Sequence, residues 1–364
     1  MHDASCCLAA APRMKFSKQK LARIVRAMRG RRIGVVGDLM LDRYLLGSAT
    51  RLSPESPVPV VDYLKEEAFP GGAGNVGSNL GALGAKVTLF GVVGDDEAGA
   101  MLRRKLAERG LPVQGLLTDA ARITTLKTRI IARHQQIVRV DRERRAPLEK
   151  KLEDRLVRFI KSAVPKLEAL VVSDYDKGVI TDGLAERILD PCHRHRVPVF
   201  VKPKTSRLLA FRGAQAIVCN RQEAAFYVQR SALQDEEAVA QAGPELLARF
   251  GCAAAVITLG EKGMSVFEEG TAKGLHIPAT SFEVTYARVG MAGLEPGTTG
   301  RQVFDVTGAG DTVLATLALA VSAGASMAEA AKLANLAAGV VVGKLGTATV
   351  TSGELLAAVR EIRE

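Results

Sequence analysis

The chain has 364 residues, of which 47% are apolar, 24% charged and 4% aromatic, with 35 glycines and no tryptophan. This composition is that of a globular protein and excludes a mostly disordered, collagen-like or disulfide-scaffold chain. Aromatic side chains are too few to supply the base-stacking surface of a single-strand nucleic-acid binder, so we expect no nucleic-acid partner.

Most of the net charge of +11 comes from one amino-terminal stretch. Residues 15–32 contain eight lysines and arginines and no acidic residue, while the rest of the chain is nearly balanced. Because such runs of like charge usually form a solvated surface, we expect residues 1–30 to be a basic extension that exposes its charge. A membrane-surface or polyanion-binding role is the less favoured interpretation.

The cysteines and the apolar stretches bear on the compartment. Five cysteines without any C-x-x-C spacing are typical of a reducing compartment and predict a cytoplasmic protein. The start of the sequence has no basic residue ahead of its short apolar run, so we expect no secretory signal. The uncharged stretch at residues 312–328 has 17 residues and predicts a core helix, because a membrane span needs about 20 apolar residues.

Short apolar segments alternate with longer helical patterns along the chain. The expected strands are 32–37, 87–93, 167–173, 197–201, 216–219 and 253–258. The expected helices lie around 75–83, 97–109, 149–163, 182–194, 222–228, 234–250, 311–323 and 327–343. Continuously apolar strands indicate burial on both faces, as in a parallel sheet covered by helices. We therefore predict a doubly wound α/β domain over residues 31–356, with a mainly parallel sheet.

Two segments have the alternating pattern of a sheet with one solvated face. Apolar and polar residues alternate at 57–65 and 123–141. They predict a small antiparallel lid, with segments at about 43–66 and 122–142. Residues 281–302, rich in glycine and threonine, are long for a connection and predict a hairpin flap or a mobile loop.

The strongest chemical signal is the sequence DVTGAGDT at 305–312, which precedes an apolar helix. Glycines at a helix start leave backbone N–H groups at the positive end of the helix dipole, where anions bind. We interpret Asp311 as the general base for an attacking hydroxyl, while the amides of Gly308, Ala309, Gly310 and Asp311 hold charge on a transferred phosphoryl group. The alternative is that Asp311 only caps the helix.

These residues resemble the carboxy-terminal signature of the ribokinase-like (PfkB) sugar kinases, and PGGAGNV at 70–76 resembles the sugar-side signature. More narrowly, GDLMLDRY at 37–44, SPESPVPVV at 53–61, SDYDKG at 173–178 and AAGVVVGKLGTATV at 337–350 are similar to the kinase domain of heptose-7-phosphate kinases. The resemblance runs in order through residues 31–350. It implies a ribokinase-like fold, ATP as phosphoryl donor, Mg²⁺ as cofactor and a homodimer joined through the lids.

The resemblance also implies roles for residues that match its motifs. Sugar hydroxyls are expected at Asp38, Asp42, Gly71, Gly72, Asn75 and Asp174, and the sugar 7-phosphate at Lys127, Arg129 and Lys177. Asn220 and Glu223 resemble the N-x-x-E motif that orders magnesium and its water shell. The nucleotide is expected at Thr258, Gly260, Gly263, Asp305, Thr307 and Asn335.

One position departs from the family pattern. The usual Asp-Pro-Lys is here Lys202-Pro203-Lys204, which places a cation where a carboxylate is expected. We expect Lys202 to reach a phosphate oxygen; the alternative is that it points away from the site. The His-x-Gly-His motif of the nucleotidyltransferase domain that many relatives carry does not occur in these 364 residues.

These implications predict an ATP-dependent kinase that phosphorylates the 1-hydroxyl of D-glycero-D-manno-heptose 7-phosphate, giving the 1,7-bisphosphate for nucleotide-heptose and lipopolysaccharide core synthesis. One alternative is another PfkB kinase that acts on a different sugar phosphate, sugar or nucleoside. A second alternative is a non-catalytic sensor of a sugar phosphate with a basic arm. The retention of Asp311 beside its glycines disfavours the sensor, since binding alone needs no base there.

Overall fold

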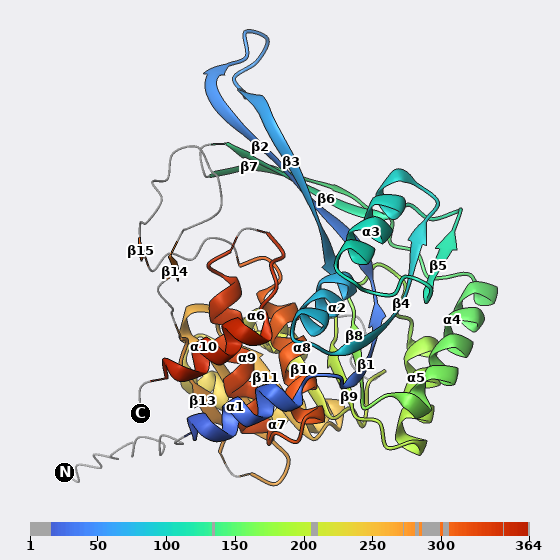
Figure 1. The fold of residues 1–364 in the computed structure, drawn as a ribbon, viewed down its shortest axis with the longest axis vertical. Coiled ribbons are helices and arrows are strands. Elements are labelled where there is room, and N and C mark those ends of the chain that lie inside the picture. The colour runs from blue at the N-terminus through green and yellow to red at the C-terminus, as the bar shows by residue number, and fades with distance from the viewer. Residues whose placement is uncertain are drawn as a thin grey trace.

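The computed structural model describes residues 16–132, 135–204, 210–271, 273–280, 306–344 and 346–362, together with the backbone at 284–285 and 299–300. Its largest feature is a sheet of nine strands in the order β13-β12-β11-β10-β9-β8-β1-β4-β5 (Figure 1). These strands are β1 (Arg32–Gly37), β4 (Lys86–Gly94), β5 (Leu116–Asp119), β8 (Ala169–Ser173), β9 (Val199–Lys202), β10 (Ala216–Asn220), β11 (Ala254–Thr258), β12 (Met264–Glu268) and β13 (Leu275–Ile277). Strand β12 is antiparallel to β11 and β13, and the other described pairs are parallel.

Helices cover both faces of this sheet, which confirms the predicted doubly wound α/β fold. One layer contains α1 (Lys18–Ala27), α2 (Ala73–Ala82), α3 (Glu97–Glu108), α8 (Ala309–Ser322), α9 (Met327–Val341) and α10 (Ser352–Arg360). The other contains α4 (Lys150–Ala163), α5 (Asp182–Arg194), α6 (Arg221–Tyr227) and α7 (Glu236–Phe250). Short 3-10 helices, η1 (Val164–Lys166) and η2 (Gly260–Lys262), lie in connections. Within β1, Ile33 and Val35 face the first layer and Val36 faces the second, so one strand fills both cores.

A second sheet of four strands, which we call the lid sheet, projects from the main one (Figure 1). Its order is β3-β2-β6-β7, with β2 (Leu39–Leu52), β3 (Pro59–Gly72), β6 (Thr125–Ala132) and β7 (Gln135–Arg142). The two outer pairs are antiparallel as predicted, but the central pair β2–β6 is parallel. The reason is that the chain returns to β6 by a crossover through the main sheet and not by a hairpin. Asp38 alone separates β1 from β2, so the lid sheet continues directly from the main sheet.

The uncharged residues 312–328 run from one helix into the next, as the separate helices expected around 311–323 and 327–343 predict. Helix α8 ends at Ser322 and α9 begins at Met327, and Gly324 between them has a φ of +91°. Among the described residues, no helix is long and apolar enough to cross a membrane.

The basic amino-terminal residues form α1, which has two different faces. Arg23 and Arg26 are exposed, as the charge pattern predicts. Leu21, Ile24 and Val25 are buried in the first core layer. The helix therefore contributes to the core as well as to the surface charge, which the charge pattern did not predict.

Residues 281–302, predicted as a flap or loop, lie mostly outside the described residues. Two short strands within them, β14 (Val284–Thr285) and β15 (Thr299–Gly300), form an antiparallel pair.

Candidate active site

The parallel strands bring the predicted site residues to one edge of the main sheet. Asp38 follows β1, Asp174 follows β8, and Lys202 and Asn220 end β9 and β10. The strands are in register there, because Ser173 pairs with both Gly37 and Lys202. Ligands of open α/β sheets bind at this carboxyl edge. The edge is therefore the candidate active site.

Helix α8 begins at this edge with the glycine turn that the motif predicts. Gly308 has a left-handed φ of +83°, and a Cβ at this position would lie 2.4 Å from Asn75 Nδ2. Only glycine allows both the turn and this close approach. Two of the amides predicted to hold phosphoryl charge are used within the turn, since Ala309 donates to Val306 O at 3.2 Å and Asp311 donates to Gly308 O at 3.0 Å. The helix start thus offers fewer free donors than the motif implied.

The carboxylate of Asp311 is 2% exposed and accepts hydrogen bonds on both oxygens. Tyr175 Oη donates to Oδ1 at 2.6 Å, and Asn75 Nδ2 donates to Oδ2 at 3.2 Å. Burial and the negative charge of Asp311 raise the pKa of the Tyr175 hydroxyl, so it remains a donor. Sequence reasoning missed Tyr175, although it lies inside the SDYDKG motif. The contact joins residues 136 positions apart and has no local signal.

Lys202 also contacts Asp311, so it does not point away from the site, and its contact with a phosphate oxygen stays a prediction. Its Nζ lies 3.0 Å from Asp311 Oδ1 and 2.9 Å from Tyr175 Oη. Burial alone lowers the pKa of the Lys202 ammonium, but the charge of Asp311 and the contact with Tyr175 outweigh burial and raise it. The cation departing from the family pattern is therefore paired with the candidate base.

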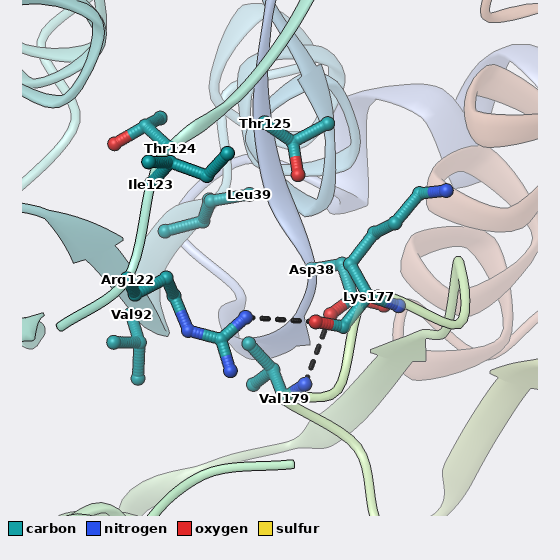
Figure 2. A pocket seen from close by; sticks show the side chains of 9 residues that line it. All are labelled: Asp38, Leu39, Val92, Arg122, Ile123, Thr124, Thr125, Lys177 and Val179. Atoms are coloured by element: carbon teal, nitrogen blue, oxygen red, sulfur yellow. Dashed lines mark hydrogen bonds between the residues drawn. The ribbon is translucent and has the colours of Figure 1, made fainter. Parts of the chain in front are cut away.

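The carboxylate of Asp38, predicted to bind sugar, is held by backbone amides. Its Oδ2 accepts from the amides of Tyr175 at 2.8 Å and Lys177 at 3.1 Å, and its Oδ1 accepts from Val179 at 3.1 Å. Figure 2 shows Asp38 beside Val179, Lys177 and Arg122 at a small pocket. Burial raises the pKa of Asp38, and the three amides oppose that shift. Asp38 thus fixes the loop that follows β8 and keeps little acceptor capacity for a ligand.

Asp42, the second predicted sugar contact, forms a buried pair with Arg129. Arg129 Nη1 lies 2.6 Å from Asp42 Oδ1, and the side chains are 8% and 4% exposed. A Cβ at Gly71 would lie 2.1 Å from Asp42 Oδ2, so a glycine is required beside this carboxylate. At Gly72, where φ is +56°, a Cβ would lie 2.5 Å from Asp38 O. Burial raises the pKa of Asp42 while Arg129 opposes the shift.

The other two cations predicted at the sugar phosphate meet at one carboxylate, Glu143. Lys177 Nζ lies 2.7 Å from Glu143 Oε2, and Lys127 Nζ lies 3.7 Å from the same atom and 3.2 Å from Asp141 Oδ2. Although burial raises the pKa of Glu143, Lys177 and Lys127 outweigh burial and lower it. Sequence reasoning missed Glu143, which follows β7. Lys127 and Lys177 are together as predicted, whereas Arg129 is engaged with Asp42.

Asn220 and Glu223 form a reciprocal cap at the start of α6. Asn220 Oδ1 accepts from the Glu223 amide at 2.8 Å, and Glu223 Oε2 accepts from the Asn220 amide at 3.0 Å. The other Glu223 oxygen pairs with Lys204 Nζ. No group of three or more acidic, histidine or cysteine side chains suited to a metal occurs in the described residues. Asn220 and Glu223 fit a magnesium ion that is held mainly by water and phosphate, because proteins contribute only one or two carboxylates to such an ion.

The described residues predicted at the nucleotide lie at the end of β11 and in the turn after it, beside Pro278 after β13, and at the start of α8. Thr258 ends β11, and Gly260 and Gly263 have φ angles of +62° and +89° in the turn that follows. Asn335 of α9 donates to Pro278 O at 2.8 Å. Thr307 precedes Gly308 at the start of α8, and Asp305 lies outside the described residues.

Asp174, predicted to bind a sugar hydroxyl, is buried, and its Oδ1 accepts a hydrogen bond from the Asp176 amide at 2.8 Å.

Similar proteins match most of the chain. The protein is 44% identical over 322 residues to the "Bifunctional protein HldE" of Geobacter sulfurreducens, a match that covers 88% of this chain and 61% of that protein. It is also 44% identical over 342 residues to the protein of the same name from Caulobacter vibrioides, covering 93% of this chain and 65% of that one. The chain thus spans less than two thirds of the length of these curated relatives.

Solved structures share the fold at low sequence identity. Phosphofructokinase-2 of Escherichia coli in complex with substrates and products matches with a TM-score of 0.71 and 17% identity, covering 91% of this chain and 98% of that one. Ribokinase of Arabidopsis thaliana complexed with ribose and ATP matches with a TM-score of 0.68 and 16% identity, covering 91% and 99%. The family model described as pfkB family carbohydrate kinase matches residues 31–352. The chain therefore belongs to the pfkB family of carbohydrate kinases and is a phosphotransferase.

Proposed function

We propose that this kinase uses ATP and Mg²⁺ to phosphorylate the 1-hydroxyl of D-glycero-D-manno-heptose 7-phosphate, in nucleotide-heptose and lipopolysaccharide core synthesis. The observation that carries the proposal is the buried Asp311 at the start of α8, on the sheet edge where the lid sheet joins the main sheet. The motifs that resemble those of heptose-7-phosphate kinases narrow the proposed substrate from sugars in general to a heptose 7-phosphate. The proposal covers the kinase reaction alone, because the chain spans 61% of its bifunctional relative.

In the proposed reaction Asp311 acts as the general base. The sugar 1-hydroxyl gives its proton to Asp311 while its oxygen bonds to the γ-phosphorus, and the bond from that phosphorus to ADP breaks. Asn75 and Tyr175 hold the two carboxylate oxygens in a fixed orientation. Positioned general bases of this kind contribute rate factors of about 10²–10⁴.

The sugar phosphate is proposed to bind where Lys127 and Lys177 meet Glu143. These cations come from the lid sheet and from the loop after β8, so a phosphate between them contacts both parts of the molecule. Glu143 carries the negative charge that holds them together without substrate. A dianionic phosphate exchanges with Glu143 because it offers more charge and more acceptor oxygens than a carboxylate.

Magnesium is proposed to lie on the Glu223 side of the site. When bound there it neutralises charge on the nucleotide phosphates. Glu223 and Asn220 would hold its water shell, and Lys204 would move from Glu223 toward the phosphates. Thr258, Gly260 and Gly263 are proposed to flank the nucleotide on the neighbouring strand end.

The proposal is tested by turnover of the purified protein with ATP and a panel of acceptors. The panel contains heptose 7-phosphate, dephospho-heptose, fructose 6-phosphate, ribose and adenosine, and Asp311→Asn serves as the inactive control. We expect the highest kcat/KM with heptose 7-phosphate and a large loss with dephospho-heptose. A higher kcat/KM with another acceptor would support the alternative that the protein is a PfkB kinase of a different substrate. Binding of a sugar phosphate without turnover would support the alternative that it is a non-catalytic sensor.

We further propose a cytoplasmic homodimer joined through the lid sheets. Leu52, Tyr63 and Leu64 of the β2–β3 ribbon are 65–66% exposed, and Val140 of β7 is 55% exposed. Tyr63 and Leu64 lie where the β2–β3 ladder shifts register, and together with Leu52 they give the outer part of the ribbon an exposed apolar surface. Such exposed apolar surface is typical of an interface. Cys192, Cys219 and Cys252 are unpaired and buried, as expected in a reducing compartment.

A further inference from the structure

Lys202 occupies an unusual position for a cation. Its Nζ lies over the first turn of α8, where a Cβ at Gly310 would be 3.1 Å from it. The positive end of a helix dipole disfavours a positive charge, and burial disfavours it further. The Lys202 side chain is only 14% exposed. Some other interaction must therefore stabilise the ammonium at this point.

The stabilising contacts come from two residues. Lys202 donates to Asp311 Oδ1 and to Tyr175 Oη, and its Nζ lies 4.8 Å from the centre of the Tyr175 ring. An ammonium has three N–H donors. Within the described residues the third donor of Lys202 has no acceptor. A buried ammonium with a donor to spare, at a helix start that attracts anions, has the chemistry to bind a phosphate oxygen.

We propose that Lys202 donates its remaining N–H to the transferred phosphoryl group and so joins that group to Asp311. This inference rests on the proposed function and extends it by a further catalytic residue. Neither the family resemblance nor the motifs assign such a role to a lysine at this position, where the family pattern has a carboxylate.

The proton transfer itself gives this contact its catalytic effect. Before reaction, the charge of Lys202 is balanced by ionised Asp311. As the sugar oxygen bonds to phosphorus and its proton moves to Asp311, that carboxylate loses its charge. The ammonium is then released from its partner while negative charge shifts toward the leaving ADP oxygen. Its interaction with the phosphates is therefore stronger in the transition state than in the ground state, as rate acceleration requires.

Three variants test the proposal. Lys202→Met keeps the chain length and removes the charge, Lys202→Arg keeps the charge, and Lys161→Met makes the same change on the exposed surface of α4. We expect Lys202→Met to lower kcat by about 100-fold with the sugar KM within about threefold of wild type. Lys202→Arg should recover at least about a tenth of wild-type kcat, and Lys161→Met should match wild type. The magnesium concentration at half-maximal rate should rise in Lys202→Met only.

A binding measurement separates this proposal from the proposed function. Calorimetry compares ADP with the β,γ-imido analogue of ATP, which differs by its terminal phosphoryl group. We expect Lys202→Met to weaken the analogue by about tenfold and leave ADP unchanged. If Lys202→Met gives this binding result but the wild-type protein phosphorylates no sugar on the panel, the proposed function is overturned and the role of Lys202 stands. Equal losses for both nucleotides, or a Lys202→Met enzyme as fast as or faster than wild type, overturn the role of Lys202. Circular dichroism verifies folding, and Lys202→Gln replaces Lys202→Met if that variant does not fold.

Discussion

Three side chains from three different elements hold the carboxylate of Asp311. Asn75 comes from α2, Tyr175 from the loop after β8 and Lys202 from the end of β9. A carboxylate that only capped its helix would accept a bond from an amide of the first turn. The side chain of Asp311 makes no such bond among the described residues. Its geometry therefore favours a chemical role over a capping role.

Asp311→Asn tests that role directly. The change keeps the size of the side chain and removes its ability to accept a proton, so we expect kcat to fall by about 10²–10⁴ while sugar binding stays nearly unchanged. Steady-state kinetics and calorimetry with the sugar phosphate measure the two effects. Turnover within a few-fold of wild type would show that Asp311 is not the base.

Gly178 allows the loop after β8 to pass close to the backbone of Ala146. Its φ is +91°, and a Cβ there would lie 1.9 Å from Ala146 O. Gly178→Ala should therefore lower the free energy of unfolding by about 2 kcal/mol or more. Gly183→Ala, on the exposed start of α5 where nothing lies within 4 Å, is the matched control and should be neutral or slightly stabilising. Urea unfolding of both proteins measures the difference, and similar losses in the two variants would contradict the argument.

At the residue scale, the sequence motifs predicted site residues that lie at a fixed spacing within a motif. They did not predict site residues that reach their partners only through the tertiary fold. Asp311 and Asn75 lie in recognisable sequence patterns and meet in the structure. Tyr175 lies inside the SDYDKG motif and Glu143 follows the lid strand β7, but which partner each contacts depends on how distant strands pack. The pairing of Lys202 with Asp311 could not be read from sequence for the same reason, since 109 positions separate them.

At the scale of elements, Glu168 joins the starts of β1 and β8. It accepts from the Arg32 amide at 2.8 Å and from Arg31 Nη1 at 2.7 Å. Although partial burial raises the pKa of Glu168, these bonds outweigh burial and lower it below its usual range. A lowered pKa in the folded state stabilises the protein above the unfolded pKa, and this contribution is lost as pH falls through the folded value.

Glu168→Gln should therefore destabilise the protein in a pH-dependent way. We expect a loss of about 1 kcal/mol in the free energy of unfolding at pH 7 and a smaller difference below pH 4. Denaturant titrations of both proteins at several pH values provide the measurement. A difference that is the same at every pH would mean that the charge of Glu168 does not matter.

Helix α1 provides a second test at this scale. Leu21 is 1% exposed within the first core layer, whereas Arg23 is exposed. Leu21→Ala should lower the free energy of unfolding by about 3 kcal/mol because it leaves a cavity, and Arg23→Ala should change it by less than about 0.5 kcal/mol. Thermal and chemical unfolding compare the two. Equal stabilities would show that α1 is only a solvated extension.

Elements with a strong apolar run were predictable, and elements whose burial changes along their length were not. The strands at 32–37 and 253–258 are continuously apolar and were predicted nearly to the residue. Strand β2 falls mostly within the predicted lid segment at about 43–66, but its bounds were not predicted, because its first half is buried and its second half is exposed, so neither pattern runs throughout. Strand β13, at the sheet edge, has only three residues, which leaves little periodicity to detect, and β12 beside it was not predicted either.

For the whole molecule, the exposed apolar residues of the lid sheet carry the prediction of a dimer. Leu64→Glu, at a side chain that is 66% exposed, should convert a dimer to a monomer by placing charge in the interface. Analytical ultracentrifugation measures the mass, and Lys161→Glu on α4 is the control for added negative charge. A wild-type protein that sediments as a monomer at micromolar concentration would refute the dimer.

Asp38 anchors the lid sheet at the point where it leaves the main sheet. Its amide donates to Ser173 O, its carbonyl accepts from Ala73, and its carboxylate accepts three more amides, so the residue between the two sheets is anchored on every side. The β2–β3 ladder changes register farther out, between Leu46 and Gly47 and between Ala49 and Arg51. We therefore expect any bending of the lid sheet to be greater at these irregular pairs than at its root. The part of the site nearest Asp38 would then be assembled before substrate binds, and adjustment to the substrate would fall to the outer half of the lid sheet.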